Sequence, residues 1–186
     1  MTGTGRHAAN LLTLLRLFCV PPIVVLILHE RHVGAMLLFV LAALTDLADG
    51  FVAKRISGRS ALGAVLDPLA DKLLMAGALL ALAVGGHVPA WLVVLVIGRD
   101  LLMVLGTLAL RLRVGRFRIA PLPIGKLSTA LQLTLVAVVL TSLALLPQIA
   151  ALIWPLALVT AAVIAGTVLA YLQAAARILA SARPPC

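Results

Sequence analysis

Apolar stretches as long as a membrane-spanning helix follow one another along nearly the whole chain. A helix needs about 20 mainly apolar residues to cross the hydrocarbon core of a bilayer. Hydrophobic residues make up 63% of the 186 residues, above the roughly 45–50% of a soluble domain. The stretches cover residues 11–28, 33–53, 62–85, 88–110, 122–146 and 149–176. The sequence therefore predicts an all-α integral membrane protein of six transmembrane helices, forming a single domain over residues 1–186.

Basic residues gather on one side of this arrangement, whereas the other side has only Arg31 and three lie within the spans. Because positively charged loops stay in the cytoplasm, this asymmetry predicts cytoplasmic termini, as in a bacterial-type inner membrane. It also accounts for the net charge of +9 without a nucleic-acid partner. Eleven of the 15 basic residues form the cytoplasmic set: Arg6, Lys54, Arg55, Arg59, Arg111, Arg113, Arg116, Arg118, Lys126, Arg177 and Arg183.

Aromatic residues and prolines indicate where individual spans begin or bend. Trp91 and Trp154 lie near the starts of the fourth and sixth spans, where an outer aromatic belt is expected. Pro21 and Pro22 interrupt the first span. They predict that this span is kinked or begins in the interface.

Four of the six acidic residues lie within 26 positions: Asp46, Asp49, Asp67 and Asp71. Apolar spans overlap both ends of this segment. Four ionised side chains at membrane depth would cost roughly 10 kcal/mol even on a lenient insertion scale. Such a cluster requires a bound cation. Its chemistry is therefore the strongest functional indication in the chain.

The spacing of these carboxylates predicts that they share one volume. Asp46 and Asp49 are three residues apart, and Asp67 and Asp71 are four apart, so each pair shares a helix face. Antiparallel second and third spans would bring the two pairs together at the cytoplasmic side, with Asp71 the deepest at about 14 Å by helical rise. Oxygen ligands of high negative charge suit hard divalent cations. Two such ions about 4 Å apart would suit phosphoryl chemistry. Solvated carboxylates at loop ends are the alternative.

The pattern Asp46-x2-Asp49-Gly50-x2-Ala53-x9-Gly63-x3-Asp67-x3-Asp71 resembles the signature of the CDP-alcohol phosphatidyltransferase family. The resemblance extends to chain length and to a six-helix fold with the motif on the second and third helices. It implies displacement of CMP from a CDP-linked lipid by an alcohol. Asp46, Asp49 and Asp67 would hold two Mg²⁺ or Mn²⁺ ions, with Asp71 as general base and possible further ligand. Gly50, Ala53 and Gly63 would line the CDP site, although for either glycine close helix packing is an equal alternative.

One position departs from the family pattern. Lys54 and Arg55 follow Ala53, where family members have arginine first. Lysine keeps the charge but lacks the bidentate fork, so either residue is a candidate for the nucleotide phosphates. Asn10, Thr13 and Arg16 resemble a pattern that the family places near cytidine. An N-cap and a single arginine reaching the interface are the alternative.

Candidates for the acceptor site are cationic. Arg99 lies within the fourth span, and Lys126 enters the fifth span at the depth of the carboxylates. Arg111 and Arg118 belong to a cytoplasmic run that anionic lipid and topology also explain. Asp100 is expected to pair with other polar groups inside the membrane.

These features predict a metal-dependent enzyme of phospholipid biosynthesis that transfers a phosphatidyl group from CDP-diacylglycerol to an anionic alcohol. The segments G-R-D-L-L and P-I-G-K-L-S-T-A-L-Q resemble the branch that makes phosphatidylglycerol phosphate and cardiolipin. The acceptor would be glycerol 3-phosphate or phosphatidylglycerol, and family resemblance implies a homodimer. Inositol-phosphate or serine acceptors, an intramembrane prenyltransferase and a cation transporter remain alternatives. The outer halves of spans two and three are apolar apart from Gly77, which disfavours an ion path.

Overall fold

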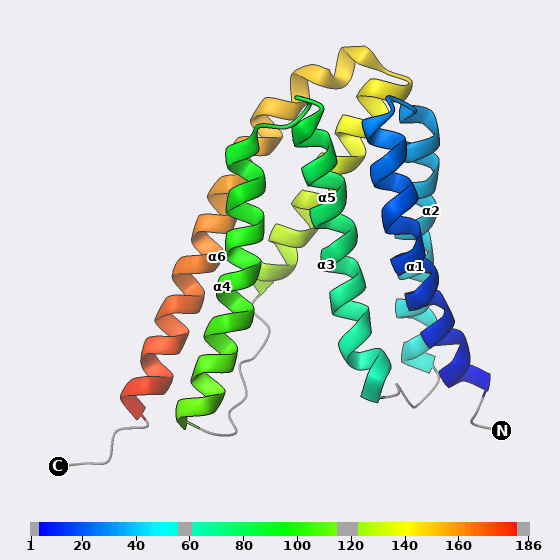
Figure 1. Ribbon diagram of the computed structural model, residues 1–186. Helices are drawn as coiled ribbons and strands as arrows, with labels where there is room; N and C mark the ends of the chain where they lie inside the picture. The colour runs from blue at the N-terminus through cyan, green and yellow to red at the C-terminus, as the bar shows by residue number, and fades with distance from the viewer. Residues whose placement is uncertain (1–3, 56–60, 115–122, 182–186) are drawn as a thin grey trace.

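The part of the chain that the computed structural model describes folds into six α-helices (Figure 1). The described backbone covers residues 4–55, 61–114 and 123–181, and the described side chains cover residues 15–45, 69–113 and 123–180. The elements are α1 (Thr4–Leu28), α2 (His32–Arg55), α3 (Ala61–Val84), α4 (Ala90–Val114), α5 (Pro123–Ala144), a short 3₁₀ helix η1 (Pro147–Leu152) and α6 (Ile153–Ser181). The predicted all-α fold of six helices is confirmed.

The helix bounds differ from the predicted spans mainly at the start of α1, which begins at Thr4 rather than at residue 11, and at the start of the sixth span. The sixth span begins as η1, with Pro147 at its start, and becomes α-helical only at Ile153. Helix α1 continues through Pro21 and Pro22 as one α-helix. Proline removes backbone donors, but Ile23 lies in the apolar core and Val20 and Val24 pack against it. This packing holds the segment in helical form.

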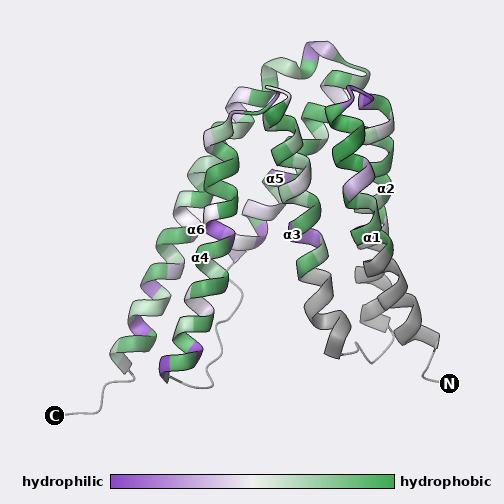
Figure 2. Cartoon of the chain, in the orientation of Figure 1, coloured by the Kyte–Doolittle hydropathy of each residue, from purple (hydrophilic) through white to green (hydrophobic). Residues whose placement is uncertain are grey.

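The long apolar helices indicate an integral membrane protein. Within the described residues, three segments are long and apolar enough to cross a membrane: Ala90–Arg113, Pro123–Ala144 and Pro147–Ala180. Two shorter apolar helical segments cover Leu15–Leu28 and His32–Thr45. Most residues of the described helices are hydrophobic (Figure 2), and many of the large apolar side chains are exposed.

The helices pack as a ring rather than in chain order. In the described part, α1 contacts α2 and α3, α4 contacts α3 and α6, and α5 contacts α2 and α6. A further contact joins α3 to α5 across the ring. Helices that are distant in sequence therefore face one another, and α5 lies beside both α2 and α3.

The apolar core lies at one end of the helices that form the ring. We call it the narrow end, and it holds the connections at residues 29–31, 85–89 and 145–152. Its largest fully buried side chains include Phe39, Leu79, Leu82, Leu92 and Leu140. Gly77 lets α1 and α3 approach closely, because a Cβ there would lie 3.2 Å from methyl groups of Val20 and Val24.

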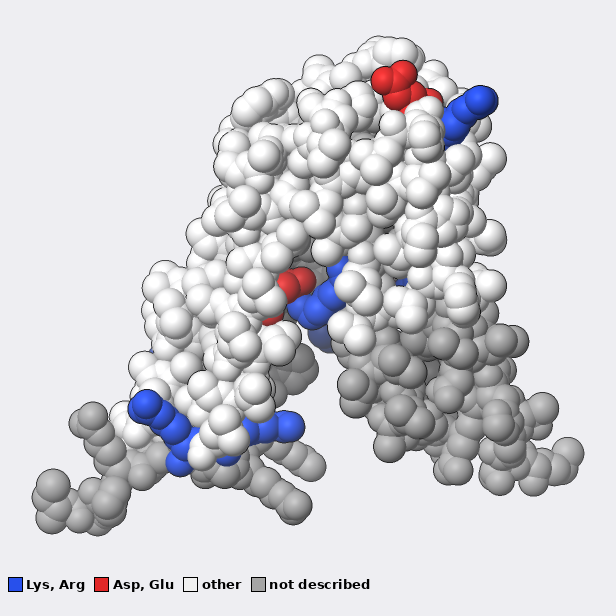
Figure 3. All heavy atoms as spheres, viewed as in Figure 1, with Lys and Arg blue, Asp and Glu red and all other residues white. Residues whose placement is uncertain are grey.

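The other end, which we call the open end, carries the start of α1 and the end of α6 (Figure 1). The space-filling view shows the molecule hollowed from this end, with basic and acidic side chains gathered at the inner end of the hollow (Figure 3). The charged groups therefore lie where the apolar core stops.

Candidate functional site

A cavity of about 330 Å³ lies between α2, α3 and α5. Asp71 of α3 lines it together with Lys126 of α5, so a carboxylate and an ammonium face one space. The remaining wall is mainly apolar: Ala42, Ala43, Leu74, Met75, Thr129, Ala130 and Leu133. This cavity brings together Asp71 and Lys126, two residues that the sequence singles out and that lie 55 positions apart in the chain.

Arg16 of α1 lies beside Asp71. Its Nη1 atom is 3.7 Å from Asp71 Oδ1, and its side chain is 2% exposed, whereas the Asp71 side chain is 43% exposed. Helix α1 contacts α2 and α3, which brings this guanidinium from the first helix to the carboxylate. A buried arginine beside a half-exposed carboxylate leaves the carboxylate accessible from the cavity while supplying positive charge behind it.

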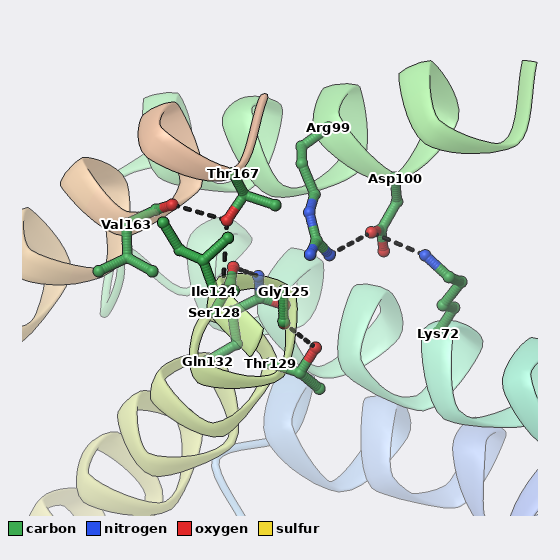
Figure 4. Close-up of polar contacts among 10 residues, drawn as sticks. All are labelled: Lys72, Arg99, Asp100, Ile124, Gly125, Ser128, Thr129, Gln132, Val163 and Thr167. Atoms are coloured by element: carbon green, nitrogen blue, oxygen red, sulfur yellow. Dashed lines mark hydrogen bonds and ion pairs between the residues drawn. The ribbon is translucent and has the colours of Figure 1, made fainter. Parts of the chain in front are cut away.

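A second set of charges lies between α3 and α4 (Figure 4). Asp100 accepts a hydrogen bond from Arg99 Nη1 at 2.8 Å and pairs with Lys72 Nζ at 2.7 Å. The predicted pairing of Asp100 with intramembrane polar groups is therefore present. Lys72 directly follows Asp71 in sequence, so the two charged sets sit on adjacent residues of α3.

Arg99 is directed toward the first turn of α5. Its Nη2 atom lies 3.6 Å from the point that a Cβ on Gly125 would occupy. Its Nε atom is buried without a hydrogen-bond partner. Arg99 thus contacts the turn of α5 that carries Lys126, although Arg99 does not itself line the cavity.

Buried polar groups on α5 extend this layer. Gln132 Nε2 donates to Ser128 Oγ at 3.2 Å, and both side chains are buried. Thr167 of α6 donates to its own helix at Val163 O, 2.8 Å away. Neither Ser128 nor Gln132 was predicted from the sequence as a site residue. Their spacing of four residues, which puts both on one face of α5, is the signal that would have identified them.

Most of the predicted metal and nucleotide residues have side chains outside the described residues. They are Asn10, Thr13, Asp46, Asp49, Gly50, Ala53, Lys54, Arg55, Gly63 and Asp67. Their backbone belongs to α1, α2 and α3, as predicted. Within the described side chains, no three His, Cys, Asp or Glu residues are grouped to hold a metal ion.

Among the described acceptor candidates, Lys126 lines the cavity, whereas Arg99 and Arg111 do not. Arg111 is exposed in the last turn of α4, about 18 Å along the helix from Arg99 by helical rise. Arg118 lies outside the described residues.

The chain matches a known protein family over nearly its whole length. The family model for CDP-alcohol phosphatidyltransferase matches residues 6–178. The chain is 36% identical to cardiolipin synthase (CMP-forming) of Rattus norvegicus over 144 residues, which are 69% of this chain and 48% of that protein. It is 37% identical to a probable phosphatidylglycerophosphate synthase of Mycobacterium tuberculosis over 141 residues, 71% of this chain and 66% of that protein.

A third relative is CDP-diacylglycerol–glycerol-3-phosphate 3-phosphatidyltransferase of Aquifex aeolicus. It is 33% identical over 125 residues, 66% of this chain and 69% of that protein. The chain spans about half the length of the mammalian cardiolipin synthases that it matches. Nearly all of the described helices fall inside the matched region. The chain belongs to the CDP-alcohol phosphatidyltransferase family.

Proposed function

We propose that this protein transfers a phosphatidyl group from CDP-diacylglycerol to an alcohol that carries a phosphate, with release of CMP. Family membership supports the reaction class. The relatives include proteins named as cardiolipin synthases and as glycerol-3-phosphate phosphatidyltransferases. Glycerol 3-phosphate and phosphatidylglycerol are therefore the two acceptors that we propose.

The observation that carries the proposal is the cavity between α2, α3 and α5. It places the Asp71 carboxylate and the Lys126 ammonium on one space. A carboxylate is able to accept the proton of an attacking hydroxyl, and an ammonium is able to bind a phosphate. The pair meets the two needs of an acceptor that is both an alcohol and an anion.

In the proposed step, the acceptor hydroxyl oxygen forms a bond to the phosphorus that bears the diacylglycerol group. The bond between this phosphorus and the oxygen that bridges to CMP breaks, and CMP leaves with the bonding electrons. Asp71 receives the hydroxyl proton. Holding the hydroxyl beside this carboxylate replaces a bimolecular encounter by a positioned one.

The residues fit a divalent metal by donor chemistry. The Asp71 carboxylate is accessible from the cavity, and carboxylate oxygens are the donors that Mg²⁺ and Mn²⁺ prefer. Ala42 and Ala43 line the cavity from α2, and by helical periodicity positions 46 and 49 share their face. We propose that Asp46, Asp49, Asp67 and Asp71 hold two such ions. Bound there, they would neutralise charge on the pyrophosphate.

Nucleotide and acceptor are proposed to occupy opposite ends of this space. Asn10, Thr13, Arg16, Gly50, Ala53, Gly63 and either Lys54 or Arg55 would bind the CDP group, on α1, α2 and α3. Lys126 and Arg99 would bind the acceptor, on α5 and α4. Arg111 and Arg118 are proposed to attract anionic substrates to the open end by their charge.

We further propose that the open end faces the cytoplasm. Exposed Arg111, Arg113 and Arg177 lie near it at the ends of α4 and α6, as the positive-inside rule requires. Exposed Trp91 and Trp154 begin the same helices at the narrow end. We also propose that the chain forms a single domain and that two copies pair as a homodimer. Protease access to a C-terminal tag in inverted and right-side-out vesicles tests the orientation, and light scattering of the detergent complex tests the dimer.

The reaction is tested by CMP release from CDP-diacylglycerol in proteoliposomes with Mg²⁺ or Mn²⁺. Glycerol 3-phosphate, phosphatidylglycerol, inositol phosphate and serine are supplied in turn. We expect CMP and a new phospholipid with one of the first two, and no turnover in EDTA. Full turnover in EDTA would exclude the metal. Transfer to inositol phosphate or serine alone would exclude the acceptor class but keep the chemistry.

A further inference from the structure

The three charges of Lys72, Arg99 and Asp100 form one connected group inside an apolar bundle (Figure 4). Asp100 is central, since it contacts both cations at 2.7–2.8 Å. Its side chain is 22% exposed and that of Arg99 is 7% exposed. Within the described side chains, Asp100 is the only carboxylate that pairs with Lys72 or with Arg99. A charge at such depth costs about 2.5–3.5 kcal/mol when unpaired, so Asp100 stabilises both neighbours.

The geometry of Arg99 depends on this carboxylate. Residues adjacent in an α-helix point about 100° apart and do not share a face. The Arg99 guanidinium nevertheless bends to Asp100, and the Nη1 bond fixes its plane. With Nη1 held, Nη2 lies against Gly125 and Nε stays buried without a partner. Donor capacity of Arg99 is thereby left over at the first turn of α5, beside Lys126.

The Lys72 contact adds a link between helices. Lys72 is on α3 and Asp100 is on α4, so their pair joins the helix that carries Asp71 to the helix that carries Arg99. The carboxylate that would receive the proton and the guanidinium that would bind the anion are thus held on helices tied together at this depth.

We propose that Asp100 is a positioning residue for the acceptor site. It holds the Arg99 guanidinium against the first turn of α5, so that Arg99 and Lys126 bind the phosphate of the acceptor alcohol together. The inference rests on the proposed transferase function and goes beyond it, because Asp100 touches neither substrate nor the reacting atoms.

The test compares Asp100→Asn with wild type in the CMP-release assay, with separate titrations of acceptor and CDP-diacylglycerol. Asn keeps the size but removes the charge that anchors Arg99. We expect the acceptor KM to rise about tenfold or more, as for a lost charged hydrogen bond, and the KM for CDP-diacylglycerol to stay within about twofold. Asp100→Glu should restore part of the acceptor affinity. Glu30→Gln, which removes an exposed carboxylate at the narrow end, is the matched control and should change neither KM.

A double-mutant cycle separates positioning from general stability. If Asp100 acts through Arg99, Asp100→Asn in an Arg99→Met background should raise the acceptor KM no further. The Met variant also removes the buried cation, which keeps the double variant folded if Asp100→Asn alone is not. Additive effects, or an equal change in both KM values, would overturn the proposal. Absence of transfer by wild type to any phosphate-bearing acceptor would instead reject the proposed function.

A binding measurement provides a readout without turnover. Glycerol 3-phosphate should raise the melting temperature of wild type in detergent by mass action, and it should raise that of Asp100→Asn less at the same concentration. Equal shifts in the two proteins would overturn the positioning role.

Discussion

The two ends of this ring of helices differ in the side chains that the same helices carry. At the narrow end, Phe39, Leu79, Leu82 and Leu92 are almost fully buried, and the helices meet through apolar contacts. Toward the open end, where the apolar core stops, Asp71 and Lys126 line a cavity, and Asp100 pairs with Lys72 and Arg99. One end supplies packing, and the other supplies charge and space.

The separation of an apolar narrow end from a charged region explains how a largely apolar chain tolerates charged residues. Side chains packed to near-crystal density leave little freedom to move, so the narrow end fixes the directions in which the helices diverge. The charges are then held at defined separations, with Arg16 and Arg99 themselves buried. The largest effects on chemistry should come from the open end, and the largest effects on folding from the narrow end.

The sharpest test of the division is Asp71→Asn. The variant keeps the side-chain shape but is a far weaker proton acceptor, so we expect transfer to fall by about 10²–10⁴-fold, the range for a lost general base. Binding of CDP-diacylglycerol and the melting temperature should change little. Glu30→Gln is the control, because it removes an exposed carboxylate from the narrow end. Equal loss of binding and turnover would identify Asp71 as a metal ligand first.

Phe39→Ala is the counterpart at the narrow end. Phe39 is 1% exposed, and loss of a buried phenyl ring costs about 3–5 kcal/mol in soluble cores. We expect a clear fall in melting temperature, with both KM values of the surviving enzyme unchanged. Phe18→Ala on α1 is the matched control, since Phe18 is 75% exposed. A change in acceptor KM without loss of stability would contradict the division.

Lys126→Ala should have a smaller and more selective effect. Lys126 lines the cavity opposite Asp71, and we propose that it binds the acceptor phosphate. Loss of one charged contact of about 1.5–3 kcal/mol should raise the acceptor KM by about tenfold or more, with that for CDP-diacylglycerol little changed. Lys126→Arg retains the charge and should keep most of the affinity. Greater loss with CDP-diacylglycerol would move Lys126 to the nucleotide side.

The sequence predicts the fold well because membrane-spanning helices are constrained locally. Length and apolar content suffice to place six helices, and their bounds agree with α1 to α5 within a few residues apart from the longer start of α1. The start of α6 is less well predicted, because η1 depends on Pro147 and on the turn that precedes it.

The site is predicted only in its residue types. The proximity of Asp71 to Arg16 and to Lys126 arises from ring packing, which brings α1 and α5 beside α3. No local pattern encodes that ring order. The same holds for Lys72 and Asp100, which lie 28 positions apart yet form an ion pair. Sequence periodicity predicts the face of a helix but not its neighbour.

The smallest effect that we predict lies at the narrow end, outside the membrane-spanning segments, in the connection that holds His87. Burial lowers the pKa of His87, the nearby His32 lowers it further, and Glu30 opposes the shift. The rings of His32 and His87 meet edge to face at 5.5 Å. Because the folded protein binds this proton less readily than the unfolded chain, stability is full above the ordinary histidine pKa of about 6.5. The stability contribution of His87 falls as the pH drops from there through the lowered pKa.

We expect the melting temperature of wild type to fall from pH 8 to pH 5 by up to about 2 °C more than that of His87→Gln. His29→Gln, at an exposed histidine of the same end, should keep the wild-type pH dependence. Identical pH profiles for wild type and His87→Gln would show that His87 does not contribute.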